Sequence, residues 1–244
     1  MRGDIFYLPD AEAVGLRAAS IFIDRSKIAT TAGGRFRVAL SGGTTPLKLF
    51  KQLDTVFAGD IKWDLTDIFW ADERCVSPDH EESNYKGAYD MLLSRLDIPP
   101  ANVHRIRGEM PPEEGAREYE KELRRCFGEQ GLPAFDLVIL GVGEDGHTAS
   151  LFPEVLSLAE SKRLAMPVYV GRLKSWRITL TLPVLNNSSD ILFLVTGPKK
   201  AHIMKELLGK GGDGRKYPAG MIKPARGNLT WLVDDEASFF LKRG

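Results

Sequence analysis

The sequence is poor in cysteine and carries no excess of charge of either sign. Its 244 residues include two cysteines, Cys75 and Cys126, and neither belongs to a C-x-x-C pair. A disulfide framework and a structural zinc site are therefore not expected, and reduced thiols in a cytoplasmic protein are the simplest interpretation. Lysine plus arginine (33) equals aspartate plus glutamate (33). This balance indicates no nucleic-acid partner and no anionic-membrane surface, so an anionic ligand needs a local cluster of basic groups.

The chain also lacks long hydrophobic runs. The N-terminal segment has no long apolar core after Arg2, so we expect no secretory signal. No apolar run approaches the ~20 residues that a membrane-spanning helix needs. The hydrophobic share of 43% and the charged share of 27% are those of an ordinary soluble globular protein. We therefore expect a cytoplasmic protein without a membrane partner, built as a single domain over residues 1–244.

Short β-like runs alternate with longer helical patterns. Strands are expected at 4–8, 35–40, 66–72, 134–140, 166–170, 177–182, 190–196 and 228–235. Helices are expected after a cap at Asp10, from Pro46 onward, and at 85–96, 113–127, 198–208 and 236–242. The Gly-rich, basic segment 209–220 is expected to be a mobile loop near a ligand. Strands that alternate with helices predict an α/β fold with a largely parallel sheet covered on both faces.

Three loops follow predicted strands, and open parallel α/β sheets bind ligands outside the carboxyl ends of their strands. The first loop, SGGTTP, combines two glycines with a threonine that can cap a helix whose first position is Pro46. Free N–H groups and the helix dipole would favour an anion there, although a plain strand-to-helix turn has the same pattern. The loop lacks the G-K-[ST] ending of a Walker A motif. The candidate anion ligands in it are Ser41, Gly42, Gly43, Thr44 and Thr45.

The second loop, WADERCV, places charged residues where an apolar strand ends. Arg74 can act as a fork for a carboxylate, a phosphate or a developing oxyanion, with Asp72 as a polar orienter. Two further basic residues fit an anion site: Arg177 opens a predicted strand, and Lys200 stands at a predicted helix start. A lysine there is unfavourable for the helix dipole unless an anion is bound. Each of these charges could also be a solvated surface group.

The third loop, GVGEDGHTASLFP (141–153), contains a literal G-x-G-x-x-G. A dinucleotide-binding fold would continue into a long helix and a second strand bearing an acid about 20 residues on. Pro153 interrupts that helix early, so we expect no nucleotide cofactor. The loop instead places Asp145 and His147 two residues apart on a Gly-flexible turn. Histidine suits general-base catalysis and a nearby carboxylate can fix its tautomer, although a lone histidine is usually structural.

The remaining histidines show no ligand spacing with one another, so we expect no metal site. They are His80, His104 and His202.

Together these segments resemble the 6-phosphogluconolactonase family. The resemblance runs through ALSGGTTPLKLF, FWADERCVSPDHEESNY, FDLVILGVGEDGHTASLFP, RITLTLPVLNNS, VTGPKKA and YPAGMIKPARGNLTWLVDDEA. It implies a three-layer α/β/α, modified Rossmann-like fold shared with sugar-phosphate isomerases and deaminases. It also implies cofactor-free hydrolysis of 6-phospho-D-glucono-1,5-lactone to 6-phospho-D-gluconate in the oxidative pentose phosphate pathway. By analogy, His147 is the base, Arg74 contacts substrate, and the phosphate ligands are residues 42–45, Arg177 and Lys200.

Two alternatives stay open beside this interpretation. Amino-sugar-phosphate deaminases carry a similar D-G-H loop, but they place a glutamate five residues after the histidine, where this chain has Phe152. A non-catalytic sugar-phosphate sensor would carry a DNA-binding segment, and the expected strand at 4–8 leaves no room for one before the sheet. We expect a monomer or a weak homo-oligomer whose partner is a small sugar-phosphate lactone.

Overall fold

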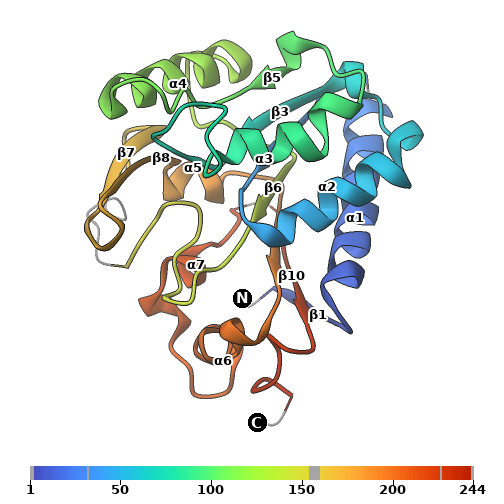
Figure 1. The fold of residues 1–244 in the computed structure, drawn as a ribbon, viewed down its shortest axis with the longest axis vertical. Helices are drawn as coiled ribbons and strands as arrows, with labels where there is room; N and C mark the ends of the chain where they lie inside the picture. The colour runs from blue at the N-terminus through green and yellow to red at the C-terminus, as the bar shows by residue number, and fades with distance from the viewer. Residues whose placement is uncertain (1–2, 32, 154–159, 226, 243–244) are drawn as a thin grey trace.

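The computed structural model describes residues 3–31, 33–153, 160–225 and 227–242. Within these residues, seven strands form one parallel sheet in the order β1-β10-β9-β6-β2-β3-β5, flanked by helices (Figure 1). A second, antiparallel sheet has the order β4-β8-β7. The parallel strands are β1 (Asp4–Leu8), β2 (Phe36–Leu40), β3 (Thr66–Trp70), β5 (Val103–His104), β6 (Leu137–Leu140), β9 (Asp190–Val195) and β10 (Asn228–Asp234). The antiparallel strands are β4 (Asp72–Arg74), β7 (Ala165–Val170) and β8 (Ser175–Leu180).

Seven α-helices lie within the described residues, and none of these is long and apolar enough to cross a membrane. In Figure 1, the first two helices of the chain pack side by side on the sheet, and the fourth lies along β7 and β8. The helices are α1 (Ala11–Thr31), α2 (Thr44–Thr55), α3 (Asn84–Met91), α4 (Pro112–Phe127), α5 (Leu182–Asn186), α6 (Ala201–Leu208) and α7 (Pro218–Met221).

The expected α/β fold with a largely parallel sheet is confirmed, but two of its expected strands belong to the other sheet. Segment 166–170 lies in β7 and residues 177–180 lie in β8, and these two strands run antiparallel to each other. The reason is the length of their connection, because a parallel pair needs a crossover of about a dozen residues or more. The expected strand 177–182 extends two residues past the end of β8, since α5 begins at Leu182. The predicted strand 66–72 is also two strands, since the chain leaves the parallel sheet after Trp70 and enters β4 at Asp72.

Two of the expected helices differ from the observed structure. The segment 236–242, expected to be a helix, forms consecutive turns, because so short a piece is not a stable helix alone. The carboxylate of Asp234 accepts hydrogen bonds from the Ala237 and Gly197 backbone N–H groups (2.8 and 2.9 Å), which ties this turn to the loop after β9. The helix expected at 85–96 ends at Met91 and is followed by a 3-10 turn, Leu93–Arg95.

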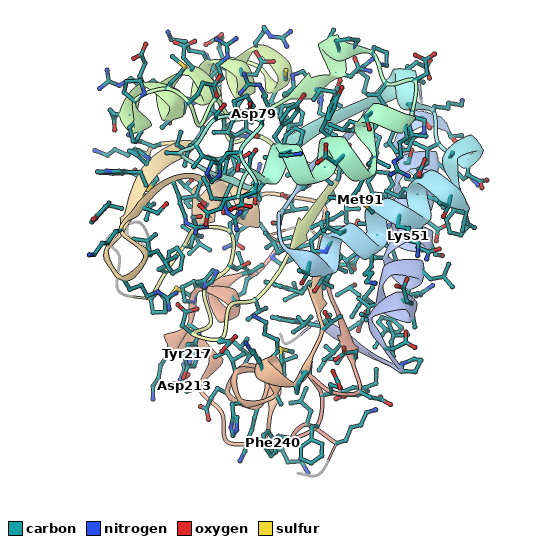
Figure 2. The ribbon with its side chains drawn as sticks, in the orientation of Figure 1. Lys51, Asp79, Met91, Asp213, Tyr217 and Phe240 are labelled. Carbon is teal, nitrogen blue, oxygen red and sulfur yellow. The ribbon has the colours of Figure 1, made fainter. Side chains whose placement is uncertain are left out.

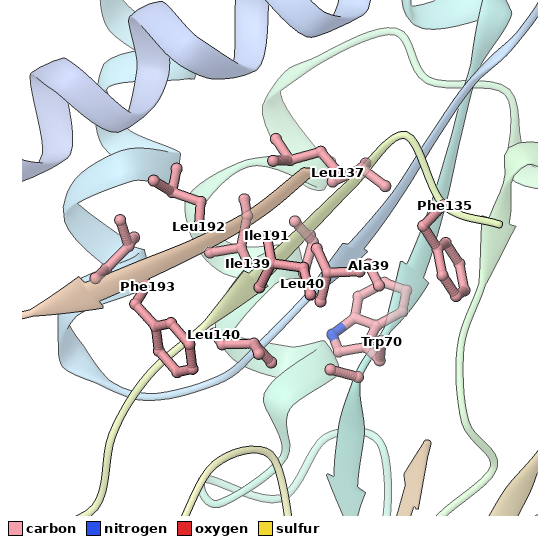
Figure 3. Packing of buried hydrophobic residues seen from close by; sticks show 14 of the residues in the cluster. Ala39, Leu40, Trp70, Phe135, Leu137, Ile139, Leu140, Ile191, Leu192 and Phe193 are labelled. Atoms are coloured by element: carbon pink, nitrogen blue, oxygen red, sulfur yellow. The ribbon is translucent and has the colours of Figure 1, made fainter. Parts of the chain in front are cut away.

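The core is built on the middle strands of the parallel sheet. Every residue of β6 and β9 is buried, as expected for strands covered on both faces. Figure 3 shows Ile139 of β6 beside Ile191 of β9, with Leu40 on the neighbouring strand β2 and Phe193 further along β9. The rings of Phe193 and Trp231 stack with their centroids 3.9 Å apart. This packing fixes the strand ends relative to one another, and those ends carry the polar loops.

Tyr119 joins α4 to the last residue of β3. Its hydroxyl donates to the Trp70 carbonyl (2.7 Å) and accepts from the Trp70 N–H (3.0 Å), and the side chain is buried. Tyr119→Phe leaves both backbone groups without that partner, so we expect the free energy of unfolding to fall by about 1–3 kcal/mol. Denaturant titration measures the change. Tyr169→Phe, which removes an exposed hydroxyl, is the control, and equal effects of the two changes would contradict this account.

Candidate active site

The carboxyl ends of four neighbouring strands, β9, β6, β2 and β3, meet at a cavity of about 240 Å³. It lies at the edge where open parallel sheets bind ligands. Candidate residues from all three predicted loops line this cavity, and so do the two later basic residues, Arg177 and Lys200. The predicted residues that line it are Ser41, Gly42, Gly43, Thr44, Thr45, Asp72, Arg74, His147, Arg177 and Lys200. Asp145 does not line it and lies behind His147.

The N-terminus of α2 faces this cavity. The helix begins at Thr44, not at Pro46, and Gly43 occupies the N-cap with a φ of 102° and no side-chain cap. The expected threonine cap is therefore wrong, because the Thr45 hydroxyl instead pairs with that of Thr196 (2.7 Å). The Ser41 hydroxyl is engaged as well, since it donates to the Ile139 carbonyl (2.8 Å). The backbone N–H groups of the first turn therefore have no side-chain cap, which is the condition in which helix N-termini favour anions.

Gly42 is required by a close neighbour. A Cβ atom at this position would lie 1.8 Å from Oδ1 of Asn84, a buried residue that the sequence analysis did not single out. The Asn84 amide donates to the Asp72 carbonyl (2.8 Å), and Asp72 also accepts from the Ser150 hydroxyl (2.6 Å). Asp72 is therefore a buried residue that links three segments lining the cavity. Its role as an orienter stays a prediction, and these hydrogen bonds are compatible with it.

Two guanidinium groups and one ammonium group supply positive charge to the cavity. Arg74 on β4 and Arg177 on β8 are directly opposite in the antiparallel register. Arg74 donates to the Glu82 carbonyl, whereas the side chains of Arg177 and Lys200 make no hydrogen bond or ion pair with any described residue. Burial, and for Arg177 the neighbouring Arg74, lowers the pKa of Arg177 and of Lys200. Arg177 and Lys200 make no ion pair with any described residue although Asp72 lines the same cavity, and crowded cations that are not paired favour an anion.

His147 and Asp145 form a hydrogen-bonded pair on the turn after β6. The distance from His147 Nδ1 to Asp145 Oδ1 is 2.5 Å. The turn is closed by bonds from Gly143 N–H to the His147 carbonyl (2.8 Å) and from Gly146 N–H to the Gly143 carbonyl (3.0 Å). Burial alone would raise the pKa of Asp145, but the hydrogen bond with His147 and the charges of His147 and Arg172 outweigh it and hold that pKa at about 2. With Nδ1 engaged, Nε2 is the ring nitrogen free to accept a proton.

Arg172 completes the support of this pair and was missed by the sequence analysis. It lies in the 3-10 turn Gly171–Leu173 between β7 and β8, and it donates a hydrogen bond to Oδ2 of Asp145. Its guanidinium carbon is 5.1 Å from the ring centroid of Phe152, which is 4.3 Å from the ring centroid of His147. No local pattern marks Arg172, because its contact with Asp145 depends on how the hairpin folds back.

The segment 209–220 contacts the same turn from the opposite direction. Tyr217, labelled in Figure 2, packs on Gly146, whose missing Cβ would lie 2.5 Å from the tyrosine ring. The Ala219 N–H donates to the Gly146 carbonyl (3.0 Å). Gly146 has a φ of 80°, a conformation that disfavours other residues. This segment, expected to be a loop, contains the 3-10 turn Gly214–Lys216 and the start of α7.

These features define an α/β protein with a cavity at one edge of its parallel sheet. A histidine that is hydrogen-bonded to an aspartate lines this cavity, together with cations that include Arg177 and Lys200. The chain belongs to the family of glucosamine-6-phosphate isomerases and 6-phosphogluconolactonases, whose model matches residues 9–231. It is 40% identical over 208 residues to 6-phosphogluconolactonase from Synechocystis sp., covering 84% of each chain. It is 37% identical over 243 residues to that of Homo sapiens, covering 98% of this chain and 94% of the human protein.

A solved structure gives the same result. The crystal structure of 6-phosphogluconolactonase from Thermotoga maritima superposes with a TM-score of 0.81 at 30% identity, covering 95% of this chain and 99% of that one. The family resemblance and the fold class expected from the sequence are confirmed.

The low pKa of Asp145 predicts a pH-dependent contribution to stability. A carboxylate whose folded-state pKa is about 2 stabilises the fold above its ordinary pKa of about 4, and this stabilisation is lost as the pH falls towards the folded value. We expect Asp145→Asn to lower the free energy of unfolding by about 2 kcal/mol near pH 5 and progressively less below pH 4. Denaturant titrations across this range measure it. Asp97→Asn, at an exposed residue without a hydrogen bond or ion pair in the described structure, is the control, and a pH-independent effect of Asp145→Asn would contradict the assignment.

Proposed function

We propose that this protein hydrolyses 6-phospho-D-glucono-1,5-lactone to 6-phospho-D-gluconate. The observation that carries the proposal is the composition of one cavity: His147 lines it together with Arg177 and Lys200, two cations that lack a partner within the described residues. A lactone with a phosphate ester presents one electrophilic carbonyl and one dianion. The carbonyl can be attacked by water that a histidine base activates, and the dianion can bind to the two cations. The names of the relatives from Synechocystis sp. and Homo sapiens support the same substrate.

The phosphate binds at the N-terminus of α2 and between Arg177 and Lys200. Helix N-termini favour anions through free N–H groups and the helix dipole. Arginine and lysine add charge-assisted hydrogen bonds, which are stronger than neutral ones. Fixing the phosphate orients the lactone ring, which places its carbonyl carbon near the Nε2 atom of His147.

The reaction then needs only water and a base. His147 removes a proton from water at Nε2 while the water oxygen bonds to the lactone carbonyl carbon. The carbonyl oxygen becomes an oxyanion, which Arg74 or a backbone N–H stabilises. When the carbon–oxygen bond of the ring breaks, His147 returns its proton to the departing ring oxygen. Asp145 holds the tautomer and stabilises the imidazolium that forms between the two transfers.

Arg172 acts through Asp145 and does not touch the substrate. Its bond to Oδ2 leaves Oδ1 for His147, so the carboxylate is held at both oxygens. Arg172 packs over the ring of Phe152, and Phe152 packs against the ring of His147, which limits rotation of the imidazole. Arg172 is therefore proposed as a positioning residue for the base.

His147→Ala tests the base directly. A positioned general base contributes about 10²–10⁴-fold, so we expect kcat for lactone hydrolysis to fall by that factor. Steady-state kinetics corrected for spontaneous hydrolysis measure it, and thermal unfolding verifies that the variant is folded. His202→Ala, at an exposed histidine on α6, should leave kcat unchanged. Near-full activity of His147→Ala would refute the base assignment.

Arg177→Ala and Lys200→Ala test the phosphate site. Each removes a charge-assisted bond of about 1.5–3 kcal/mol, so we expect KM for the phosphorylated lactone to rise roughly 10- to 150-fold with a smaller change in kcat. Turnover of unphosphorylated gluconolactone should be nearly insensitive to both substitutions. Lys199→Ala, at the exposed neighbour of Lys200, is the matched control. If both lactones lose activity equally, these residues are not phosphate ligands.

Arg172→Gln tests the positioning role. Misplacement of a reacting group can cost up to about 10²-fold, so kcat should fall within that range while KM changes little. Because a positive charge beside the Asp145–His147 pair is lost, the acid limb of the pH–rate profile should move to higher pH. Arg172→Lys keeps the charge and should restore the position of that limb. An unmoved limb in Arg172→Gln would exclude an effect on the base.

A further inference from the structure

A second group of ionisable side chains lies where α4 packs beside β5, the edge strand of the parallel sheet. His104 ends the edge strand β5, while Glu122 and Cys126 are one turn apart on α4, facing it. Asp67, near the start of β3, lies behind the imidazole. No step of the proposed reaction uses these residues. The sequence analysis expected no metal site, because neither cysteine belongs to a C-x-x-C pair and the histidines show no ligand spacing with one another. It did not compare Cys126 with His104.

Three of these side chains converge as metal ligands do. His104 Nδ1 lies 2.6 Å from Glu122 Oε1 and 3.8 Å from Cys126 Sγ, and Sγ lies 3.9 Å from Oε1. A tetrahedral Zn²⁺ ion places a nitrogen and an oxygen ligand about 3.3 Å apart, and either of them about 3.5 Å from sulfur. Each pair therefore needs a shift of well under about 1 Å to reach these separations.

The surroundings of the imidazole also suit a metal ligand. Metal-binding histidines usually present their second nitrogen to a carboxylate, which fixes the ring and its tautomer. Here Nε2 of His104 is buried without a hydrogen-bond partner among the described residues. The carboxylate that faces it, Asp67, has Oδ1 3.6 Å away and accepts hydrogen bonds from Arg35 at both oxygens (2.8 and 2.7 Å). The His104 ring stacks on Phe69 with centroids 4.3 Å apart. A cavity of about 250 Å³ borders His104 and Cys126, so water can reach a fourth coordination position.

Three arginines stand close to this group, and a cation must be compatible with them. Arg35, Arg37 and Arg125 line the same cavity. Binding of one divalent ion would release two protons, one from the His104 imidazolium and one from the Cys126 thiol. The total charge of the group is therefore unchanged. Arg125 binds both carboxylate oxygens of Glu122, at 2.9 Å for Oε2. That oxygen can stay with Arg125 while Oε1 turns to a metal.

The geometry points to a Zn²⁺ site formed by His104, Glu122 and Cys126, with Asp67 as the carboxylate behind the histidine. Thiolate, imidazole and carboxylate together favour a borderline ion such as Zn²⁺ over Mg²⁺ or Ca²⁺. Such an ion would clamp α4 to the two-residue edge strand β5. Its role would be to stabilise the fold, independently of the lactonase cavity.

Co²⁺ is the spectroscopic probe for this site. Titration of chelator-treated protein should give one Co²⁺ per chain with the visible bands of tetrahedral cobalt and a sulfur-to-metal charge-transfer band, and Zn²⁺ should displace it. Cys126→Ser should abolish the charge-transfer band, and Asp67→Asn should weaken Zn²⁺ binding about 10- to 100-fold. Cys75→Ser, at the other cysteine, should leave the spectrum unchanged.

Lactonase activity and thermal unfolding in the presence of chelator establish that each variant is folded. Added Zn²⁺ should then raise the Tm of the parent and of Cys75→Ser, but not that of Cys126→Ser. The proposal is overturned if the parent shows no charge-transfer band, if Cys126→Ser retains it, or if Cys75→Ser loses it.

Discussion

The hydrogen bond between Asp145 and His147 is the interaction on which the proposed chemistry depends. At 2.5 Å it fixes Nδ1 of the imidazole and leaves Nε2 for the substrate. The surrounding structure serves to hold this pair: Arg172 occupies the second carboxylate oxygen, and Phe152 packs against the imidazole ring. Tyr217 packs on the glycine between the two residues, so the turn is supported from both sides.

The parallel sheet explains how residues far apart in the sequence reach one cavity. Four neighbouring strands end at the same edge, so the loops after β2, β3, β6 and β9 must lie together. The antiparallel sheet, with its hairpin, contributes three arginines that do not belong to the parallel strands. It brings Arg177 opposite Arg74, and its hairpin carries Arg172 to Asp145. The first sheet thus sets the position of the base, and the second supplies cations for binding and for support.

Much of this arrangement could be predicted from sequence because it depends on local patterns. Apolar runs followed by Gly-rich or charged segments marked the strand ends, and His147 stood out between Gly-rich turns. The antiparallel sheet was missed, although the short connection between β7 and β8 excluded a parallel crossover. Arg172 and Asn84 could not have been found this way, since their roles depend on contacts with Asp145 and Asp72, 27 and 12 residues away in the chain. The helix cap at Thr44 or Thr45 was wrong because the Thr45 hydroxyl has a tertiary partner, Thr196.

Phe152 separates the proposed lactonase from an amino-sugar deaminase with a similar D-G-H loop. Its ring lies 4.3 Å from that of His147, at the position where the deaminase pattern has a proton-transferring glutamate. A lactone needs only an activated water, whereas amino-sugar ring opening needs that second acid. The most direct measurement is therefore a parallel assay of the purified protein on 6-phosphogluconolactone and on glucosamine 6-phosphate. The account predicts lactone hydrolysis well above the spontaneous rate and no ammonia release even at high enzyme concentration. Robust ammonia release, or lactone hydrolysis no faster than the spontaneous rate, would contradict it.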